Sequence, residues 1–326
     1  MFSNIIGHKN VTSFLEKSLK NGEVSHAYLF YGPARLGKKT VAERFVETML
    51  GQPILNHPDI YEVRRERKEK EEKLAKNISV EQVRDFQQKL SLTSFLNSYK
   101  IGIIEEAETL STEAANSLLK TLEEPTPKTV IILLSTSISA LPATIVSRCQ
   151  TLKFLPVAKE KIYDRLLDLG ASRDEARDLA GISWGKPGLA FDFWQAQKED
   201  GKDSAVAKYE ERARSILDLM KAETMHDKMK IFDEVLGKDS GTEDLFGSLD
   251  QILALWTSIL RDAAMLGAGC PELVSNTKFS KEIKKFSNRF NLEFFPRMHR
   301  EIRLAGKYFG ENLNPRLVLE NLMLSF

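Results

Sequence analysis

The chain has 326 residues, with 47 Lys and Arg against 46 Asp and Glu. This length allows two or three domains, and the charge balance gives no overall positive field that would by itself indicate nucleic-acid binding. Two distant cysteines and five scattered histidines exclude a disulfide framework and give no ligand-spaced zinc cluster, so no metal site is predicted. We recognise no signal peptide and no apolar run of membrane-spanning length, and expect a cytoplasmic protein with no membrane partner.

The N-terminal half alternates between strand and helix patterns. Strands are expected over 28–31, 60–63, 100–104 and 129–134, and helices over 11–21, 40–50, 79–90 and 111–122. Ser79 to Gln82 has the pattern of a capping box, and Ser111 can cap the next helix. This alternation predicts an α/β fold in which a parallel sheet carries helices on both faces, with the chemistry at the carboxyl ends of the strands.

A dense mixture of both charge signs covers 64–76. It is typical of a solvated loop or an exposed helical extension, and a DNA-binding patch is the alternative, disfavoured because acids interrupt the basic field.

No strand pattern returns after Pro156. The rest of the chain is a series of helical patterns. Their boundaries are marked by a capping box at 172–175, a polar linker at 198–204 and a cap at Asn314-Pro315. We predict a nucleotide-binding domain over 1–156, a small helical lid over 157–203 and a helical domain over 204–326. An apolar stripe at helical spacing can be either core or interface; it is formed by Leu249, Ile252, Leu253, Trp256, Ile259 and Leu260.

The segment 28–40 has the layout of a strand, a glycine-bounded loop and a helix. The spacing of Gly32 and Gly37-Lys38 is that of a P-loop, in which backbone N–H groups and a helix N-terminus surround a phosphate that the lysine also reaches. The next residue should carry a hydroxyl that ligates Mg²⁺, but it is Lys39, whose ammonium repels a cation. Thr40 lies about 100° further around the helix and cannot replace that hydroxyl. The degenerate P-loop is assigned to Gly32, Gly37, Lys38, Lys39 and Thr40.

The strand over 101–104 ends in Glu105-Glu106, which has the form of a Walker-B strand. Such a strand usually ends in Asp-Glu, where the Asp supports Mg²⁺ and the Glu polarises the attacking water. Glu105 extends the carboxylate by one methylene. Together with Lys39 this argues against Mg²⁺-dependent hydrolysis, whereas metal-free nucleotide binding stays open.

Several segments resemble the bacterial clamp-loader AAA+ subunits, and the pattern is most similar to the delta-prime type within that family. The similarity covers nearly the whole chain; it is carried by residues 25–30, by 114–125 with its Leu-Glu-Glu-Pro ending, by Ser147-Arg148-Cys149, and by 312–320. It implies an AAA+ P-loop domain with a parallel sheet, a small helical lid and an all-α collar domain that packs in a pentamer.

The resemblance also implies roles for single residues. Arg148 stands at the position of an arginine finger, which enters a neighbour's nucleotide site and stabilises charge on the γ-phosphate. A surface arginine in an intramolecular ion pair is the alternative. Thr136, after Ser135, matches the sensor-1 position, although hydroxyls at a strand end are equally often a local cap.

Departures from the family pattern separate this chain from the active ATPases. Lys39 replaces the metal ligand, Arg35 is bulky for a loop that holds phosphates, and Gly188 stands where the lid would carry a sensor-2 arginine. The four-cysteine zinc module common in the family is absent from 51–59.

The resemblance therefore implies a mostly non-hydrolysing subunit of the DNA polymerase III holoenzyme, with gamma/tau-type and delta subunits as partners, and with the sliding clamp and primer–template DNA as indirect ones. No cofactor is required, and ADP or ATP bound weakly or without Mg²⁺ is the alternative. An active gamma/tau-type ATPase and a free-standing AAA+ nucleic-acid-binding protein are the other functions considered.

Overall fold

The computed structural model describes residues 2, 4–55, 57–66, 75–94, 99–199, 205–237, 242–310 and 313–325. The chain forms two compact units. The N-terminal unit is Met1–Arg165 with Gly185–Leu189, and the C-terminal unit is Leu166–Trp184 with Ala190–Phe326. The predicted division at residues 156 and 203 stays a prediction. Most of the predicted linker and of the charge run 64–76 lies outside the described residues.

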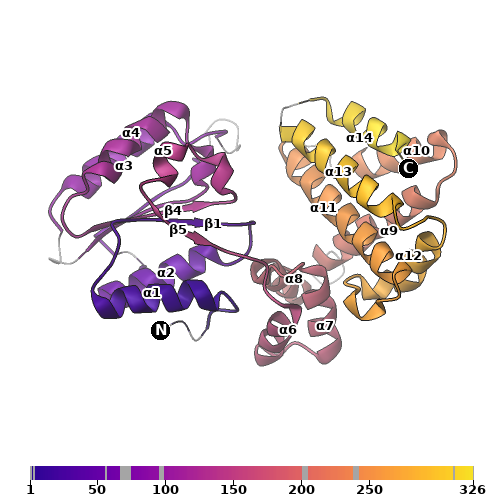
Figure 1. Ribbon diagram of the computed structural model, residues 1–326, viewed down its shortest axis with the longest axis horizontal. Coiled ribbons are helices and arrows are strands. Elements are labelled where there is room, and N and C mark those ends of the chain that lie inside the picture. Colours follow the sequence, from indigo (N-terminus) through magenta and orange to yellow (C-terminus); the bar gives the residue numbers. More distant parts are fainter. Residues whose placement is uncertain are drawn as a thin grey trace. The chain divides into compact units, whose positions relative to one another are not determined.

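A five-stranded parallel sheet forms the centre of the N-terminal unit (Figure 1). The strands are β1 (Ala27–Tyr31), β2 (Ile60–Val63), β3 (Lys100–Ile104), β4 (Thr129–Ser135) and β5 (Gln150–Lys153), in the order β2-β3-β4-β1-β5. The predicted α/β class and parallel sheet are confirmed. The sequence patterns missed β5, because this edge strand buries only Leu152 and has no apolar run.

Helices cover both faces of this sheet, as predicted. Figure 1 shows α1 (Lys9–Asn21) and α2 (Lys38–Leu50) on one face, and α3 (Val80–Ser91), α4 (Thr112–Glu123) and α5 (Ala143–Val146) on the other. The capping box of α3 is confirmed by the bonds between Ser79 and Gln82, and Ser111 caps α4 through the Ala114 N–H. Two 3₁₀ turns follow β3 and β4, at Ala107–Thr109 and Ile138–Ala140, and α6 (Lys159–Asp168) spans the boundary between the units.

Side-chain alternation along the strands creates two cores. In β1, Tyr28 and Phe30 pack with α1 and α2, whereas Leu29 packs in the core beneath α3 and α4. A Cβ atom on Gly102 of β3 would lie 2.3 Å from the Phe86 ring. Because there is a core on each face of the sheet, the side chains on both sides of a central strand are apolar. Such a strand reads as an unbroken apolar run, which is why β1, β3 and β4 were recognisable.

The C-terminal unit is helical, and its described residues contain no strand. Its helices are α7 (Arg173–Ile182), α8 (Pro187–Glu199, which begins in the N-terminal unit), α9 (Ala205–Lys221), α10 (Met225–Gly237), α11 (Thr242–Gly267), α12 (Ser280–Ser287), α13 (Phe294–Gly310) and α14 (Pro315–Leu324). Short 3₁₀ turns lie at Pro271–Leu273 and Thr277–Phe279. The predicted caps of α7 and α14 are confirmed. No described helix combines the length and apolar character needed to cross a membrane.

The apolar stripe of α11 belongs to the core of this unit. Ile252, Leu253, Trp256, Ile259 and Leu260 are all buried within the chain. The side chain of Leu249 lies outside the description.

A buried polar network joins the helices on either side of residue 203. The fully buried Asp262 of α11 accepts hydrogen bonds from the backbone N–H groups of Ser275 and Asn276 and from Asn276 Nδ2, the last at 2.7 Å. Ser258 accepts from Trp184 Nε1 at 2.8 Å and from Asn276 Nδ2 at 3.0 Å. Tyr209 of α9 donates to Asn276 Oδ1, and burial together with the Asp262 charge raises the pKa of Tyr209. The network fixes the loop before α12 against α9, α11 and the end of α7.

Replacement of Asp262 should destabilise the C-terminal unit. Asp262→Ala removes the acceptor of the backbone N–H groups of Ser275 and Asn276 and of one Asn276 Nδ2–H, and we expect the free energy of unfolding to fall by about 3 kcal/mol. All three tryptophans (Trp184, Trp194 and Trp256) lie in this unit, so tryptophan fluorescence during urea unfolding reports on it specifically.

Asp218→Ala is the matched control, because Asp218 forms only an exposed ion pair with Lys221. Its effect should stay below about 0.5 kcal/mol. Equal effects of the two substitutions would show that the network does not stabilise this unit.

Candidate functional site

The candidate residues gather at the carboxyl edge of the sheet. The loop after β1 leads through Gly32 to Lys38, Glu105 follows β3, and Thr136 follows β4. Since these strands are parallel and β4 pairs with both β1 and β3, their carboxyl ends meet at one edge. Thr40 is exposed on the first turn of α2.

Lys38, at the end of the P-loop, forms hydrogen bonds to carbonyl groups at its beginning. Its Nζ donates to the Gly32 carbonyl at 2.5 Å and to the Pro33 carbonyl at 2.8 Å. Gly32 has φ +145°, and a Cβ atom there would lie 2.3 Å from the Phe154 carbonyl oxygen. Glycine is therefore required at this position by the close approach of the backbone that follows β5, in addition to any need for phosphate access.

The pKa of Lys38 lies much closer to neutral pH than that of an ordinary lysine. Burial is the main reason that the pKa of Lys38 falls to about 8; the Glu108 carboxylate opposes this shift and the Lys186 ammonium adds to it. Burial also lowers the pKa of Lys186. Two half-buried ammonium groups thus act on the same region of the P-loop, which favours an anion there.

Lys39 lies among three carboxylates. Its Nζ is 2.7 Å from Glu105 Oε1, 3.4 Å from Glu62 Oε2 and 4.0 Å from Glu43 Oε1. Burial lowers the pKa of Lys39, but the hydrogen bond and charge of Glu105, together with the other two carboxylates, raise it above its ordinary value. The ammonium therefore stays charged and offsets part of the negative charge of these three acids.

This arrangement does not fit Mg²⁺. A divalent ion at this place would meet the Lys39 ammonium within ion-pair distance of Glu105, the carboxylate that should support the metal. Within the described residues, no group of three His, Cys, Asp or Glu is arranged to hold a metal ion.

The other predicted site residues have partners within the chain. Glu106, with φ +49°, turns to Arg65, whose Nε lies 2.6 Å from Glu106 Oε2. The Thr136 hydroxyl donates to Glu108 Oε1 at 2.6 Å, and the Thr136 N–H donates to the same oxygen. Glu108 lies 28 positions away in the sequence, so this contact is not a local cap, whereas the Ser135 hydroxyl does donate locally to the Ser137 carbonyl. Glu108 Oε2 is buried and has no hydrogen-bond partner in the described part of the chain.

Residues 185–189 lie on the P-loop, within the N-terminal unit. The Gly188 N–H donates to the Arg35 carbonyl at 2.9 Å, and a Cβ atom on Gly188 would lie 2.9 Å from that oxygen. Arg35 itself has φ +64°, a left-handed conformation unusual for a residue with a side chain. Gly188 therefore has a packing role in addition to lacking a sensor-2 side chain.

Arg148 forms an exposed intramolecular ion pair. It follows α5; its Nη2 lies 2.5 Å from Glu123 Oε1, and its Nη1 donates to the Thr144 carbonyl at 2.8 Å. The side chains of Arg148 and Glu123 are 34% and 49% exposed. This is the alternative that the sequence left open, and an arginine finger would have to exchange Glu123 for a neighbour's phosphate.

Sequence reasoning missed several residues of this site. Glu43 and Glu62 complete the cluster around Lys39, Glu108 holds Thr136, and Lys186 lies near Lys38. Glu43 could have been found, because it lies one helical turn after Lys39. Glu62 could not, because its position depends on the pairing of β2 with β3.

The chain is similar to known subunits of DNA polymerase III. Residues 7–158 match the family model described as DNA polymerase III, delta subunit. The chain is 32% identical over 189 residues to subunit delta' of Bacillus subtilis (strain 168), covering 53% of this chain and 55% of that protein. It is 32% identical over 182 residues to subunit tau of the same organism, covering 51% and 31%.

Two further similarities are shorter or more distant. Subunit delta' of Pseudomonas aeruginosa is 38% identical over 142 residues, covering 38% of this chain and 42% of that protein. A solved gamma subunit-related protein from Thermotoga maritima is 21% identical with a TM-score of 0.43, covering 95% of this chain and 97% of that one. The chain spans about a third to about a half of the length of the curated relatives it matches.

Adjacent lysines should differ in their reaction with an amine-specific reagent. As the pH rises through about 8, Lys38 loses its proton and becomes nucleophilic, whereas the carboxylates around Lys39 keep that amine protonated. We expect labelling near pH 8.5, localised by mass spectrometry, to favour Lys38 over Lys39 about tenfold.

Glu105→Gln is the companion variant, because it removes the hydrogen-bonded charge that raises the pKa of Lys39. Labelling of Lys39 should then increase. A wild-type preference for Lys39 would contradict the described charge arrangement.

Proposed function

We propose a function for this chain from the premise that, through residues 7–158, it belongs to the DNA polymerase III clamp-loader family. The chain acts as a delta-prime-like subunit that does not hydrolyse ATP itself. It donates Arg148 to the ATP site of a neighbouring gamma/tau-type subunit while the sliding clamp is loaded. The observation that carries the proposal is the ion pair between Lys39 and Glu105.

This ion pair supports a site that is inactive in hydrolysis. The acid at the Walker-B position already has a permanent cationic partner belonging to the chain. Hydrolysis in P-loop enzymes needs a metal that bridges the phosphates and neutralises developing charge. A lysine tethered to α2 cannot coordinate phosphate and water oxygens in that way, so no hydrolytic step is assigned to this chain.

The same geometry is compatible with binding a nucleotide without metal. Lys38 and Lys186 supply positive charge, and the N-terminus of α2 faces the loop. We therefore propose that ADP or ATP binds weakly and without Mg²⁺, and that no cofactor is required for folding or assembly.

The exposed ion pair of Arg148 leaves it available to another subunit. A pair of this kind contributes only about 0–1 kcal/mol in water, and a triphosphate carries more negative charge than one carboxylate. Exchange of Glu123 for phosphoryl oxygens would therefore cost little and would place a planar, always-charged group against the γ-phosphate.

The proposed partners are gamma/tau-type and delta subunits in the cytoplasm, with the sliding clamp and primer–template DNA contacted as part of the assembly. The similarity to subunits named delta' supports this choice of partners.

An active gamma/tau-type ATPase is the second candidate, and the similarity to subunits named tau and gamma favours it. Hydrolysis of ATP by the purified chain with Mg²⁺, abolished by Lys38→Ala, would support this candidate over the first. A free-standing AAA+ nucleic-acid-binding protein is the third, and assembly with the other replication subunits would count against it.

Replacement of Arg148 should reduce ATP turnover by its neighbour. In a complex reconstituted with gamma/tau-type and delta subunits, Arg148→Ala should lower turnover at the adjoining site by about 10³-fold, because the charge on the γ-phosphate loses its guanidinium. Total phosphate release by the complex, measured with clamp and primed DNA, should fall by the amount that this one ATP site contributes.

Two control variants separate this role from folding. Arg148→Lys keeps the charge but not the fork of donors and should restore only part of the rate, whereas Glu123→Gln removes only the local partner and should leave turnover intact. Unchanged turnover with Arg148→Ala in an assembled complex would exclude Arg148 as the finger.

Replacement of Lys39 should restore affinity for Mg²⁺-nucleotide. Lys39→Thr frees the three carboxylates and supplies the missing hydroxyl, so calorimetric titration of the isolated chain should show about tenfold tighter binding of ADP with Mg²⁺ than without it. Lys39→Ala removes the ammonium but adds no hydroxyl and should gain less. If neither variant responds to Mg²⁺, the lysine is not what blocks the metal.

A further inference from the structure

Positive charge is concentrated in α12 and α13. Residues 281–307 hold eight Lys and Arg against three Glu, although the whole chain is almost neutral. The rest of the chain is consequently net acidic. A local basic surface therefore exists where the overall composition gave no sign of one.

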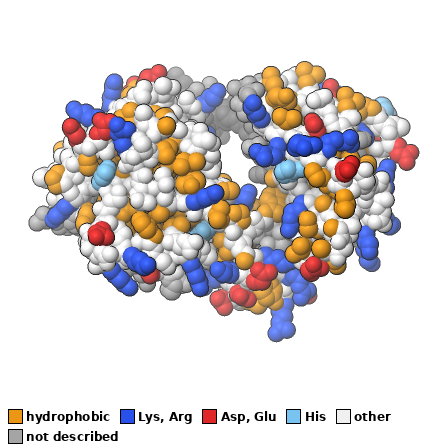
Figure 2. Space-filling view, viewed as in Figure 1, with side chains coloured by type: hydrophobic (Ala, Val, Ile, Leu, Met, Phe, Trp, Pro, Cys, Tyr) orange, Lys and Arg blue, Asp and Glu red, His pale blue; other side chains and the backbone are white. Residues whose placement is uncertain are grey.

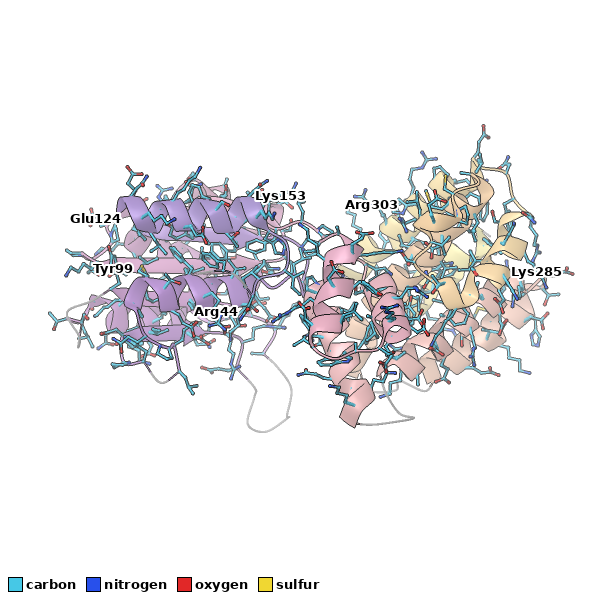
Figure 3. All side chains as sticks on the ribbon, turned by 90° about the horizontal axis from the view of Figure 1, so that it is seen from below. Arg44, Tyr99, Glu124, Lys153, Lys285 and Arg303 are labelled. Carbon is cyan, nitrogen blue, oxygen red and sulfur yellow. The ribbon has the colours of Figure 1, made fainter. Side chains whose placement is uncertain are left out.

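The charges of α13 lie along the side that faces away from the core. Met298, Ile302 and Ala305 are buried, and α13 packs on α11 and α14. At about 100° per residue, the exposed residues Arg297, Arg300, Arg303 and Lys307 fall on the opposite side. We call these four residues the basic ridge. Figure 2 shows Lys and Arg side chains in a row over this helix, and Figure 3 shows Arg303 pointing away from the unit.

Within the described part of the chain, the three arginines of the ridge have no carboxylate partners. Arg297 lies over the Phe294 ring, 5.6 Å from its centroid, and no Asp or Glu of the described chain is within ion-pair distance of Arg297, Arg300 or Arg303. Other arginines do have carboxylate partners, such as Arg65 with Glu106 and Arg316 with Glu320. Three neighbouring arginines without a carboxylate in ion-pair distance are suited to a partner that supplies many anions in a line.

We propose that the basic ridge binds the phosphate backbone of DNA. The ridge extends over about 15 Å of helix, and duplex DNA carries one negative charge per about 1.7 Å of its axis. The planar guanidinium fork suits the oxygens of a phosphate group. The surface of an acidic protein would offer a lower density of negative charge than duplex DNA. Binding of an acidic partner is therefore the alternative outcome of the test.

The basic ridge assigns a place to the DNA contact of the proposed function and rests on it, but its test is separate from the test of Arg148. It lies in the C-terminal unit and uses neither Lys38 nor Arg148. Failure of DNA binding at the ridge would leave the arginine-finger proposal standing, and failure of that proposal would leave the ridge standing.

The test compares two triple variants of equal charge in the full chain. Arg297→Gln, Arg300→Gln and Arg303→Gln remove three charges from the ridge, and Lys281→Gln, Lys284→Gln and Lys285→Gln remove three exposed charges from α12. Figure 3 shows Arg303 and Lys285 on different sides of the C-terminal unit. Binding of a labelled primer–template duplex is followed by fluorescence anisotropy over a series of salt concentrations.

The ridge variant should bind at least about tenfold more weakly, and the slope of log affinity against log salt should fall by about three. The α12 variant should change affinity less than about threefold. Tryptophan fluorescence during urea unfolding confirms that each variant is folded. Equal losses in both variants, an unaffected ridge variant, or tighter binding of a poly-glutamate peptide than of DNA to the ridge would overturn the proposal.

Discussion

The arrangement of the candidate site depends on the ion pairs that the Lys39 ammonium forms. This ammonium brings together carboxylates from α2, from β2 and from the end of β3, and without it these three acids would repel one another across the edge of the sheet. A fixed side chain thus supplies the positive charge that a P-loop enzyme obtains from a diffusible metal ion. The residue at the position expected for a Mg²⁺-ligating hydroxyl therefore also reduces the repulsion among these three carboxylates.

Much of the N-terminal unit could be predicted because its signals are local. The strands β1, β3 and β4 are buried on both faces, so each reads as a short apolar run. The caps of α3 and α4 lie within three residues of their partners. The edge strand β5 could not be predicted, because one buried leucine gives no periodicity.

The candidate site was only half predictable, for a physical reason. Lys39 and Glu105 are recognisable from their places in two motifs, but their contact joins residues 66 positions apart and depends on the order of strands in the sheet. Gly188 gives a second example. The sequence shows only that an expected arginine is absent, whereas the structure shows a backbone approach to Arg35 that leaves no room for a side chain.

The close contact between Gly32 and the backbone at Phe154 has a mechanical consequence. Phe154 follows β5, and β5 begins two residues after Arg148, so one short extended strand connects the phosphate-binding loop to the exposed guanidinium. Extended strands are stiff along their length, and this one is held against β1 throughout. One continuous extended segment, paired with β1, therefore sets the backbone positions of both the contact at Gly32 and the residues that follow Arg148.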